Sequence, residues 1–339
     1  MEWEDSFVSL LEIKNLETAF RIGDEYYNAV DQISLDLQPN EVLAIVGESG
    51  CGKSTLATTV MGLHNSNYTR SKGEVLYNNQ NLLDLSEEEM AKIRTKEIGM
   101  IFQDPLSSLN PLQKIGRQIE EALVYHTNLD KKQRQDRVLE LLNQVGIPYP
   151  ERCANQYPHE LSGGMRQRVM IAMALSCKPN IIIADEPTTA LDVTIQAQIL
   201  DLLKELQDEM EAGIILITHD LGVVAEMADR VAVLYAGQVI EIGTVSQIFK
   251  NSQHPYTKSL LKSIPNFQDD SESDELYVID GMVPSLRNLK RIGCRFADRI
   301  SWLPQEAHEE NPTLHDLGDG HQVRCTCYQT FYFKEDAVK

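Results

Sequence analysis

The chain has 339 residues, of which 42% are hydrophobic, and a formal net charge of −20. This length predicts one large domain with a smaller appendage, and the acidity argues against a broad nucleic-acid surface, because such surfaces neutralise phosphates with Lys and Arg. No apolar run reaches the roughly 18 residues of a membrane-spanning helix, and the start Met1-Glu2-Trp3-Glu4-Asp5 is acidic where a signal peptide is basic. We therefore expect a soluble, cytosolic protein whose six scattered cysteines are reduced thiols.

The first predicted strands differ in burial. Residues 10–16 and 32–37 alternate apolar and polar side chains, which is typical of half-buried antiparallel strands. The run Val42-Leu43-Ala44-Ile45-Val46 is wholly apolar, as expected of a strand buried on both faces. A glycine-rich loop, residues 47–54, follows directly, and residues 54–61 suit a helix.

The middle of the chain changes character. Apolar residues from about 107 to 160 recur at helical spacing among many charges, which predicts a helical insertion. After it, a helix over Met165–Leu175 is expected. Strands are then predicted at 181–184, 213–218 and 231–235, interleaved with helices such as 195–210. Strand and helix in alternation predict an α/β fold with a mainly parallel sheet.

The C-terminal part is set off by a break near residues 251–255. The polar stretch 268–275 is predicted to be a linker or exposed loop. Residues from about 276 onward are expected to form a small, separate element.

The loop after the buried strand matches the pattern of a phosphate-binding loop. Glycines let successive N–H groups point at phosphate oxygens, and the following helix contributes its positive end. Lys53 is expected to reach the β- and γ-phosphates, and Ser54 and Asp185 to hold Mg²⁺, while Glu186 acts as general base toward an attacking water. The residues expected to surround the phosphates are Gly47, Glu48, Ser49, Gly50, Cys51, Gly52, Lys53, Ser54 and Thr55.

Leu161-Ser162-Gly163-Gly164-Met165 is the most distinctive segment. Ser162, Gly163 and Gly164 stand at the start of a predicted helix, where exposed N–H groups and the helix dipole make a second phosphate-binding end. One chain cannot easily bring both ends onto the same γ-phosphate, because the phosphate loop already encloses it from one side.

The order of the phosphate loop, this pentapeptide and Asp185-Glu186 resembles the nucleotide-binding subunit of an ATP-binding cassette (ABC) transporter. The resemblance implies a P-loop nucleotide-binding domain over residues 1–250, with a helical subdomain inserted at about 104–178, and a C-terminal extension over 251–339. It also implies that the pentapeptide closes over ATP held by a partner subunit, in a head-to-tail dimer that sandwiches two nucleotides.

Smaller motifs extend the resemblance. Gln103 matches the family glutamine that senses the γ-phosphate through Mg²⁺ or water, and His219 matches the switch histidine that hydrogen-bonds the γ-phosphate. In Ala190-Leu191-Asp192, the aspartate matches one that crosses the dimer interface; read alone, it is a helix cap. Phe20 lies where the family stacks an aromatic side chain on adenine, with Tyr26 and Tyr27 as rivals and core packing as the alternative.

The segment 102–111 and the segment 254–261 resemble the ATPase subunits of peptide/nickel importers, in particular the oligopeptide-permease D-type subunits. Residues 281–286 and 293–296 carry this match over nearly the whole chain. The resemblance implies import of oligopeptides or dipeptides. Import of nickel or another small solute remains an alternative, as does a non-transport ABC ATPase.

Many members of this family carry four tail cysteines that can hold an iron-sulfur cluster. Here Cys294 and Cys325 are kept, but Ile300 and Ala307 replace the other two, and Cys327 is an extra thiol. A cluster normally takes four thiolates, so we predict none. The alternatives left open are idle thiols or a zinc site. The zinc site would use Cys294, Cys325 and Cys327 with one of His308, His315 and His321.

The resemblance also implies partners. These are two integral membrane permease subunits, a second ABC ATPase subunit in a heterodimer and, indirectly, an extracytoplasmic solute-binding protein. A homodimer is chemically possible, because the chain has a complete set of motifs. Peripheral attachment to the cytoplasmic face of the cell membrane follows from these partners.

Overall fold

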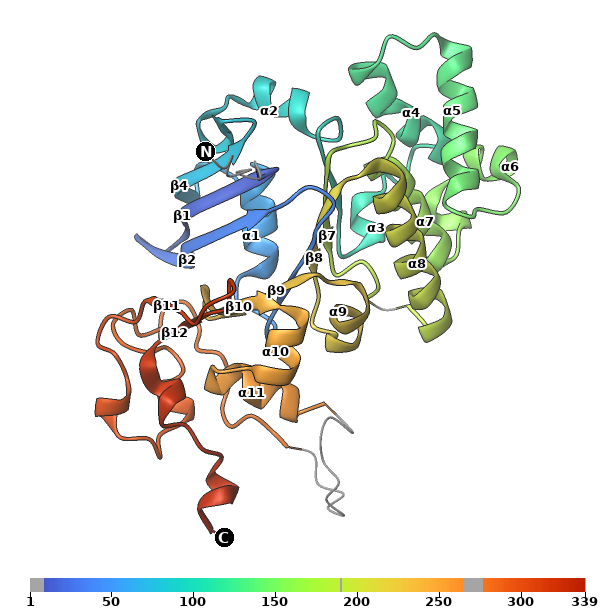
Figure 1. Cartoon of the computed structure of the whole chain (residues 1–339). Coiled ribbons are helices and arrows are strands. Elements are labelled where there is room, and N and C mark those ends of the chain that lie inside the picture. The colour runs from blue at the N-terminus through green and yellow to red at the C-terminus, as the bar shows by residue number, and fades with distance from the viewer. Residues whose placement is uncertain (1–8, 190, 265–276, 339) are drawn as a thin grey trace, which may run out of the picture.

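The computed structural model describes residues 9–189, 191–264 and 277–338 (Figure 1). The predicted linker at 268–275, the acidic start at residues 1–5 and Ala190 lie outside the described residues. In the described part, one four-stranded sheet has the order β2-β1-β4-β5, and one eight-stranded sheet has the order β11-β12-β10-β9-β3-β8-β7-β6. The predicted α/β class is confirmed.

The smaller sheet is antiparallel, and α1 packs between part of it and the larger sheet, while β2 also contacts β8 and β10 directly (Figure 1). Its strands are β1 (Leu11–Ile22), β2 (Glu25–Leu37), β4 (Thr69–Tyr77) and β5 (Gln80–Asn81). The first two are longer than the sequence pattern predicted, because Gly23 and Asp24 make a two-residue turn and the strands pair up to Ile22 and Glu25.

The larger sheet is parallel at its centre. Its parallel strands are β3 (Val42–Val46), β6 (Ile98–Ile101), β7 (Ile181–Asp185), β8 (Gly213–Ile217) and β9 (Arg230–Tyr235). Their apolar side chains are buried on both faces, as the unbroken runs predicted. The antiparallel strands are β10 (Gln238–Thr244), β11 (Leu314–Asp316) and β12 (Gln322–Arg324).

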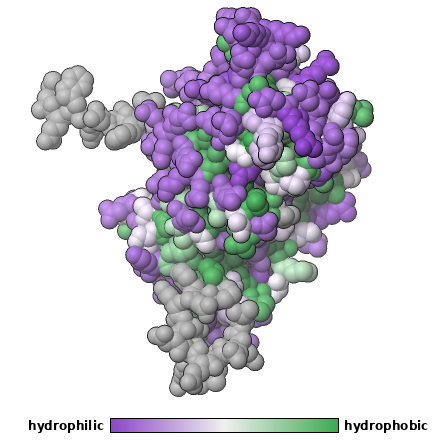
Figure 2. Space-filling model, turned by 90° about the vertical axis from the view of Figure 1, so that its right-hand side faces the viewer, coloured by the Kyte–Doolittle hydropathy of each residue, from purple (hydrophilic) through white to green (hydrophobic). Residues whose placement is uncertain are grey.

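Helices cover the sheets and build a subdomain, which is the green region in Figure 1. They are α1 (Lys53–Val60), α2 (Glu87–Ile93), α3 (Pro105–Ser108), α4 (Ile115–His126), α5 (Lys131–Gln144), α6 (Pro150–Ala154), α7 (Gly163–Ala174), α8 (Val193–Met210), α9 (Leu221–Met227), α10 (Val245–Asn251) and α11 (Pro255–Lys262). Two begin two residues earlier than predicted, because Ser162 caps α7 and Asp192 caps α8. Figure 2 shows that the upper end of the molecule is almost entirely hydrophilic.

The expectation of a separate C-terminal element is wrong. β12 pairs with β10 and extends the larger sheet, with Glu241 opposite Val323. Phe296 packs edge to face against Tyr235 of β9 and Tyr256 of α11. The physical reason is that β10 would otherwise expose an unpaired edge and an apolar face, both of which the C-terminal residues cover.

Candidate functional site

Four neighbouring parallel strands end at the same edge of the larger sheet. They are β3, β8, β7 and β6, in that order across the sheet. The phosphate loop follows β3, Asp185 ends β7, and Gln103 and His219 come shortly after β6 and β8. Residues predicted from four distant segments are therefore gathered at one edge, which is where open α/β sheets bind ligands.

The phosphate loop has a shape that only glycine permits at two points. Gly47 has φ 151° and Gly52 has φ 109°. A Cβ at Gly47 would lie 2.2 Å from the carbonyl oxygen of Leu234, and one at Gly52 would lie 2.6 Å from that of Ala29. The loop therefore packs directly on neighbouring backbone, and this fixes the direction of its N–H groups.

Lys53 holds this loop from inside. Its Nζ donates to the carbonyl oxygens of Gly47 at 2.7 Å and Glu48 at 3.2 Å, and the residue is 5% exposed. It also contacts Sγ of Cys51 at 3.9 Å, and no carboxylate of the described residues forms an ion pair with it, so the ammonium can interact with an anion.

A hydroxyl and a carboxylate meet at the start of α1. Ser54 Oγ donates to Asp185 Oδ1 at 3.1 Å. Burial raises the pKa of Asp185, with the neighbouring Glu186 adding to the rise. Two hard oxygen donors, one of them a carboxylate whose ionised form is disfavoured by burial, fit a divalent cation such as Mg²⁺.

Two other predicted site residues, Gln103 and His219, lie next to the carboxylate of Glu186. Gln103 Nε2 and Thr189 Oγ1 each donate to its Oε2 at 2.8 Å, and His219 Nδ1 lies 3.4 Å from its Oε1. Burial acts to raise the pKa of Glu186, but the hydrogen bond from Thr189 and the charges of His219 and Lys53 hold that pKa below its ordinary value. Its backbone has φ 47°, a strained conformation for a residue with a side chain.

The pentapeptide presents a capped helix start. Ser162 Oγ accepts from the N–H of Met165 at 3.3 Å, which caps α7. A Cβ at Gly163 would meet nothing within 4 Å, whereas one at Gly164 would lie 3.1 Å from Cγ2 of Ile195. In the described part of the chain, Ser162 hydrogen-bonds only within this helix start, and no bond joins it to the phosphate loop.

Asp192 and Phe20 have structural partners within the chain. Asp192 Oδ1 accepts from the N–H of Ile195 at 3.0 Å and so caps α8. Phe20 lies half-buried near the end of β1, edge to face with His64 at 5.3 Å between ring centroids. Of its two rivals, Tyr26 lies under the guanidinium of Arg70 and Tyr27 donates to Glu25. None of these contacts tests adenine stacking.

Two residues that sequence reasoning missed hold Glu48 of the phosphate loop. The N–H of Glu48 donates to Oη of Tyr256 at 2.8 Å. Arg299 Nη1 donates to Oε2 of the same glutamate at 2.6 Å. Tyr256 lies in a segment that the sequence marked only through resemblance, and no local pattern marked Arg299.

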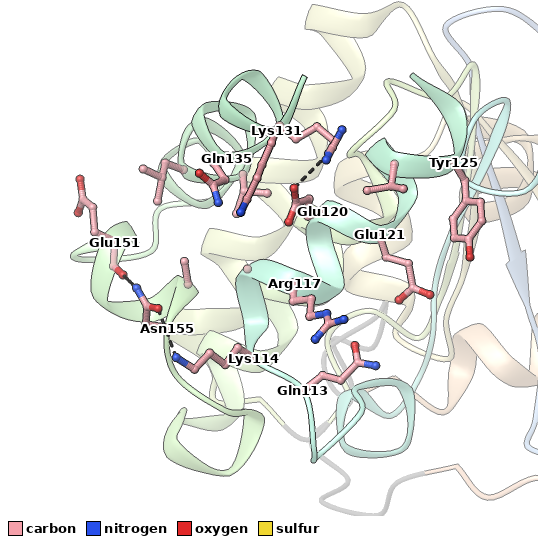
Figure 3. Close-up of a pocket in the computed structure, with 16 residues that line it drawn as sticks. Gln113, Lys114, Arg117, Glu120, Glu121, Tyr125, Lys131, Gln135, Glu151 and Asn155 are labelled. Carbon is pink, nitrogen blue, oxygen red and sulfur yellow. Dashed lines mark hydrogen bonds and ion pairs between the residues drawn. The ribbon is translucent and has the colours of Figure 1, made fainter. Parts of the chain in front are cut away.

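The helical subdomain also contains a hollow of about 900 Å³ between α4, α5 and α6 (Figure 3). Its lining mixes charges of both signs, and Arg134 donates to Glu120 across it at 3.1 Å. No predicted site residue lines this hollow, and we assign it no part in the nucleotide site.

Two family models match the chain. The ABC transporter model matches residues 30–189, and the model of the oligopeptide/dipeptide transporter C-terminal region matches residues 240–301.

Several curated relatives match nearly the whole length. The oligopeptide transport ATP-binding protein OppD of Lactococcus lactis subsp. cremoris (strain SK11) is 52% identical, with 98% of each chain covered. OppD of Bacillus subtilis (strain 168) is 50% identical, with 93% of this chain and 88% of the relative covered. The dipeptide transport ATP-binding protein DppD of L. lactis subsp. cremoris (strain MG1363) is 50% identical, with 92% and 89% covered.

Solved ATP-binding cassettes share the fold. The dimeric post-hydrolysis state of the cassette MJ0796, bound to ADP and Pi, matches with 34% identity and a TM-score of 0.63, covering 69% of this chain and 98% of that one. The structure of cbiO1 from Clostridium perfringens, part of a transporter complex, matches with 31% identity and a TM-score of 0.60, covering 72% and 91%.

Proposed function

This chain belongs to the ABC transporter family of ATP-hydrolysing subunits, and we propose that it powers the import of oligopeptides or dipeptides through a membrane transporter. One observation carries this proposal. The same chain has the predicted ATP-site residues at the ends of β3, β8, β7 and β6, called the nucleotide edge below, and a C-terminal region that matches the oligopeptide/dipeptide transporter model. Nickel import and a non-transport role are not favoured, since the relatives named above are oligopeptide and dipeptide transport proteins.

We propose that the phosphate loop binds the phosphates of ATP, and that Ser54, Asp185 and Gln103 hold Mg²⁺. When bound, Mg²⁺ supplies positive charge that neutralises phosphate oxygens. The hydroxyl and carboxylate at 3.1 Å support this assignment, because Mg²⁺ prefers such oxygen ligands. Phe20 remains our choice for stacking on adenine.

We assign Glu186 as the general base. Because its pKa is held below the ordinary value, the carboxylate is ionised at neutral pH and can take a proton from an attacking water. Gln103 and Thr189 both donate to Oε2. A water that donates to this oxygen would therefore take the place of the hydrogen bond from Gln103. His219 Nδ1 lies 3.4 Å from Oε1, which supports our proposal that this histidine orients the base and donates to the γ-phosphate.

The pentapeptide acts on a nucleotide held by another subunit. Gly163 has open space around it, and the helix start at Ser162 offers N–H groups and a positive dipole to an anion. In the closed dimer Ser162, Gly163 and Gly164 would contact ATP on the partner, and Asp192 would cross the interface. ATP then favours closure because it contacts both subunits only in the closed state, and hydrolysis resets the dimer.

A groove beside Gln103 is the proposed contact with the permease. It has a volume of about 380 Å³ and lies between the end of α1, β6, α4 and α7. Its lining includes Phe102, which precedes Gln103, together with Leu63, Leu109, Tyr125 and Met170. We propose that a short amphipathic cytoplasmic helix of a permease subunit fills it, so that movement of Gln103 is transmitted to the membrane.

The remaining partners follow from this assignment. Two integral membrane permease subunits, a second ATPase subunit in a heterodimer and an extracytoplasmic solute-binding protein would complete the transporter, with this chain at the cytoplasmic face of the membrane. In the ranges 9–189, 191–264 and 277–338, none of the helices is both long and apolar enough to cross a bilayer.

Uptake by cells tests the proposed function. A strain that lacks this chain should fail to take up labelled dipeptides or oligopeptides, and wild-type chain should restore uptake. Lys53→Ala should not restore it, because removing the loop ammonium should weaken ATP binding about tenfold or more. The exposed Lys72 provides a matched control, since Lys72→Ala should restore uptake fully. Restoration by Lys53→Ala, or a defect confined to nickel uptake, would contradict the proposal.

A further inference from the structure

Three thiols and one imidazole converge in the C-terminal region. One ligand atom each from Cys294, His308, Cys325 and Cys327 lies within 4.8 Å of every other. Cys325 and Cys327 are buried, and Cys294 and His308 are half-buried. Residues up to 33 positions apart in sequence therefore form one compact donor set.

The fold brings this set together from three segments. Cys294 precedes a 3₁₀ turn over Ala297–Arg299, and His308 follows another over Gln305–Ala307. Cys325 and Cys327 come directly after β12, the strand that pairs with β10 of the large sheet. Cys325 has φ 69°, a backbone conformation that is strained for a residue with a side chain and that clusters at functional sites.

The imidazole of His308 has one ring nitrogen without a hydrogen-bond partner among the described residues. Nδ1 of His308 is fully buried and has no hydrogen-bond partner. Leaving such a nitrogen unpaired costs free energy, whereas a metal ion would satisfy it. The other two candidate histidines are already engaged, since His315 pairs with Glu309, and His321 pairs with Glu241 at 2.9 Å. The choice among three histidines, which the sequence left open, is therefore settled in favour of His308.

The three thiols are free cysteines in apolar surroundings. No disulfide joins them in the described chain. The surroundings include Phe296, Leu303 and Ile300. Such surroundings would shield a bound metal ion from water.

The donor set does not fit the iron-sulfur cluster that the family resemblance raised. The two positions where the resemblance implies cysteine are Ile300, which is 1% exposed in an apolar cluster, and Ala307. His308 and Cys327 replace them from different places. Four ligands on a single zinc ion at about 2.0–2.3 Å stand roughly 3.5–3.8 Å apart in a tetrahedron, which a set within 4.8 Å can reach by small side-chain shifts. A four-iron cluster needs more room, because each cysteine binds a different iron.

We propose that Cys294, His308, Cys325 and Cys327 bind one Zn²⁺ ion in a closed, structural Cys₃His site. All four positions are filled by protein, so the ion would have no open coordination site and no part in hydrolysis. Its role is to fasten three segments of the C-terminal region to each other and to β12. Arg299, five residues after Cys294, is held in the same unit, and this inference stands independently of the transported solute.

Metal analysis of the full-length chain, purified without a metal-affinity tag, tests the site. We expect about one zinc per chain and no acid-labile sulfide. Replacement of zinc by Co²⁺ should give the intense visible absorption of a tetrahedral site and the charge-transfer band of cobalt bound to thiolates. Absence of bound metal, iron with sulfide, or a cobalt spectrum without thiolate bands would overturn the proposal.

Variants identify the ligands. Cys327→Ser and His308→Ala should each weaken zinc binding by about tenfold or more. Cys153→Ser, a buried thiol outside the set, should retain full zinc and serves as the matched control. His308→Cys should retain zinc as a Cys₄ site, so that loss in His308→Ala is not mistaken for misfolding. Full zinc content in both Cys327→Ser and His308→Ala would contradict the assignment.

Discussion

Arg299 and Glu48 form a two-pronged ion pair that joins the C-terminal extension to the phosphate loop. Nη1 of Arg299 lies 2.6 Å from Oε2 of Glu48 and Nη2 lies 3.3 Å from Oε1. The arginine also donates through Nε to the carbonyl oxygen of Asp280 at 2.6 Å and is 8% exposed. The extension therefore fixes the position of the loop that we propose binds nucleotide, although the two residues are 251 positions apart.

Arg299→Ala should loosen the loop. The loss of charge-assisted bonds to a largely buried arginine should cost about 2 kcal/mol of unfolding free energy, and ATP affinity should fall because the loop is less ordered. Urea unfolding and ATP titration measure the two effects. Lys290 provides the control, since its ion pair with Asp298 is exposed on both sides, and Lys290→Ala should change stability by less than about 0.5 kcal/mol. Equal behaviour of the two variants would show that the ion pair has no effect on the loop.

Glu186→Gln should separate binding from hydrolysis. The amide keeps the size of the side chain and can still accept from Thr189, so ATP binding should be retained. It cannot take a proton, and turnover of the assembled transporter should fall by about 100-fold or more. Glu211, an exposed residue at the end of α8, is the matched control, because Glu211→Gln should hydrolyse ATP normally. Wild-type turnover in Glu186→Gln would exclude this residue as the base.

Asp185→Asn should stabilise the nucleotide-free chain at neutral pH. Burial raises the pKa of Asp185, so the native state is penalised when this carboxylate is ionised. The penalty is absent below the ordinary pKa of an aspartate, about 4, and reaches its full size above the raised native pKa. Asparagine never ionises and avoids it.

Thermal unfolding measured against pH checks this sign. Asp185→Asn should melt above wild type at pH 7, and the difference should vanish as the pH falls toward about 4. The same variant should lose Mg²⁺-dependent hydrolysis. A variant that melts below wild type at neutral pH would show that Asp185 is stabilised, not penalised, in its native environment.

Much of the nucleotide edge was predictable, because its polar residues directly follow strands that are unbroken apolar runs in the sequence. Val42–Val46 and Ile181–Asp185 are buried on both faces, so their apolar runs mark strand ends at which Lys53 and Glu186 must emerge on the same edge. The glycine pattern at Gly47 reflects a close approach of backbone that no other residue allows.

The C-terminal contacts were not predictable in the same way. β12 has only three residues, too few to show alternation, and its pairing with β10 follows from covering a sheet edge. Arg299 is an isolated charge with no periodicity, and its partner is distant in sequence. The selection of His308 depends on which nitrogens other residues already engage, and only the structure shows those bonds.

The central claim is that each nucleotide is completed by the helix start of another subunit, and Gly163→Asp tests it most directly. A side chain at Gly163 meets open space, so the variant should fold and bind ATP in its own phosphate loop as wild type does. Its carboxylate would face the γ-phosphate held by the partner subunit, where like charges repel. Asn143→Asp, which adds the same charge at an exposed position of α5, is the control.

The measurement is ATP hydrolysis by the transporter purified from membranes, alongside ATP titration of the isolated chain. We predict unchanged ATP affinity in the isolated Gly163→Asp chain and a loss of hydrolysis of about 100-fold in the assembled transporter, with Asn143→Asp normal in both. Wild-type hydrolysis by the assembled Gly163→Asp transporter would contradict the claim, as would a loss of ATP binding by the isolated chain.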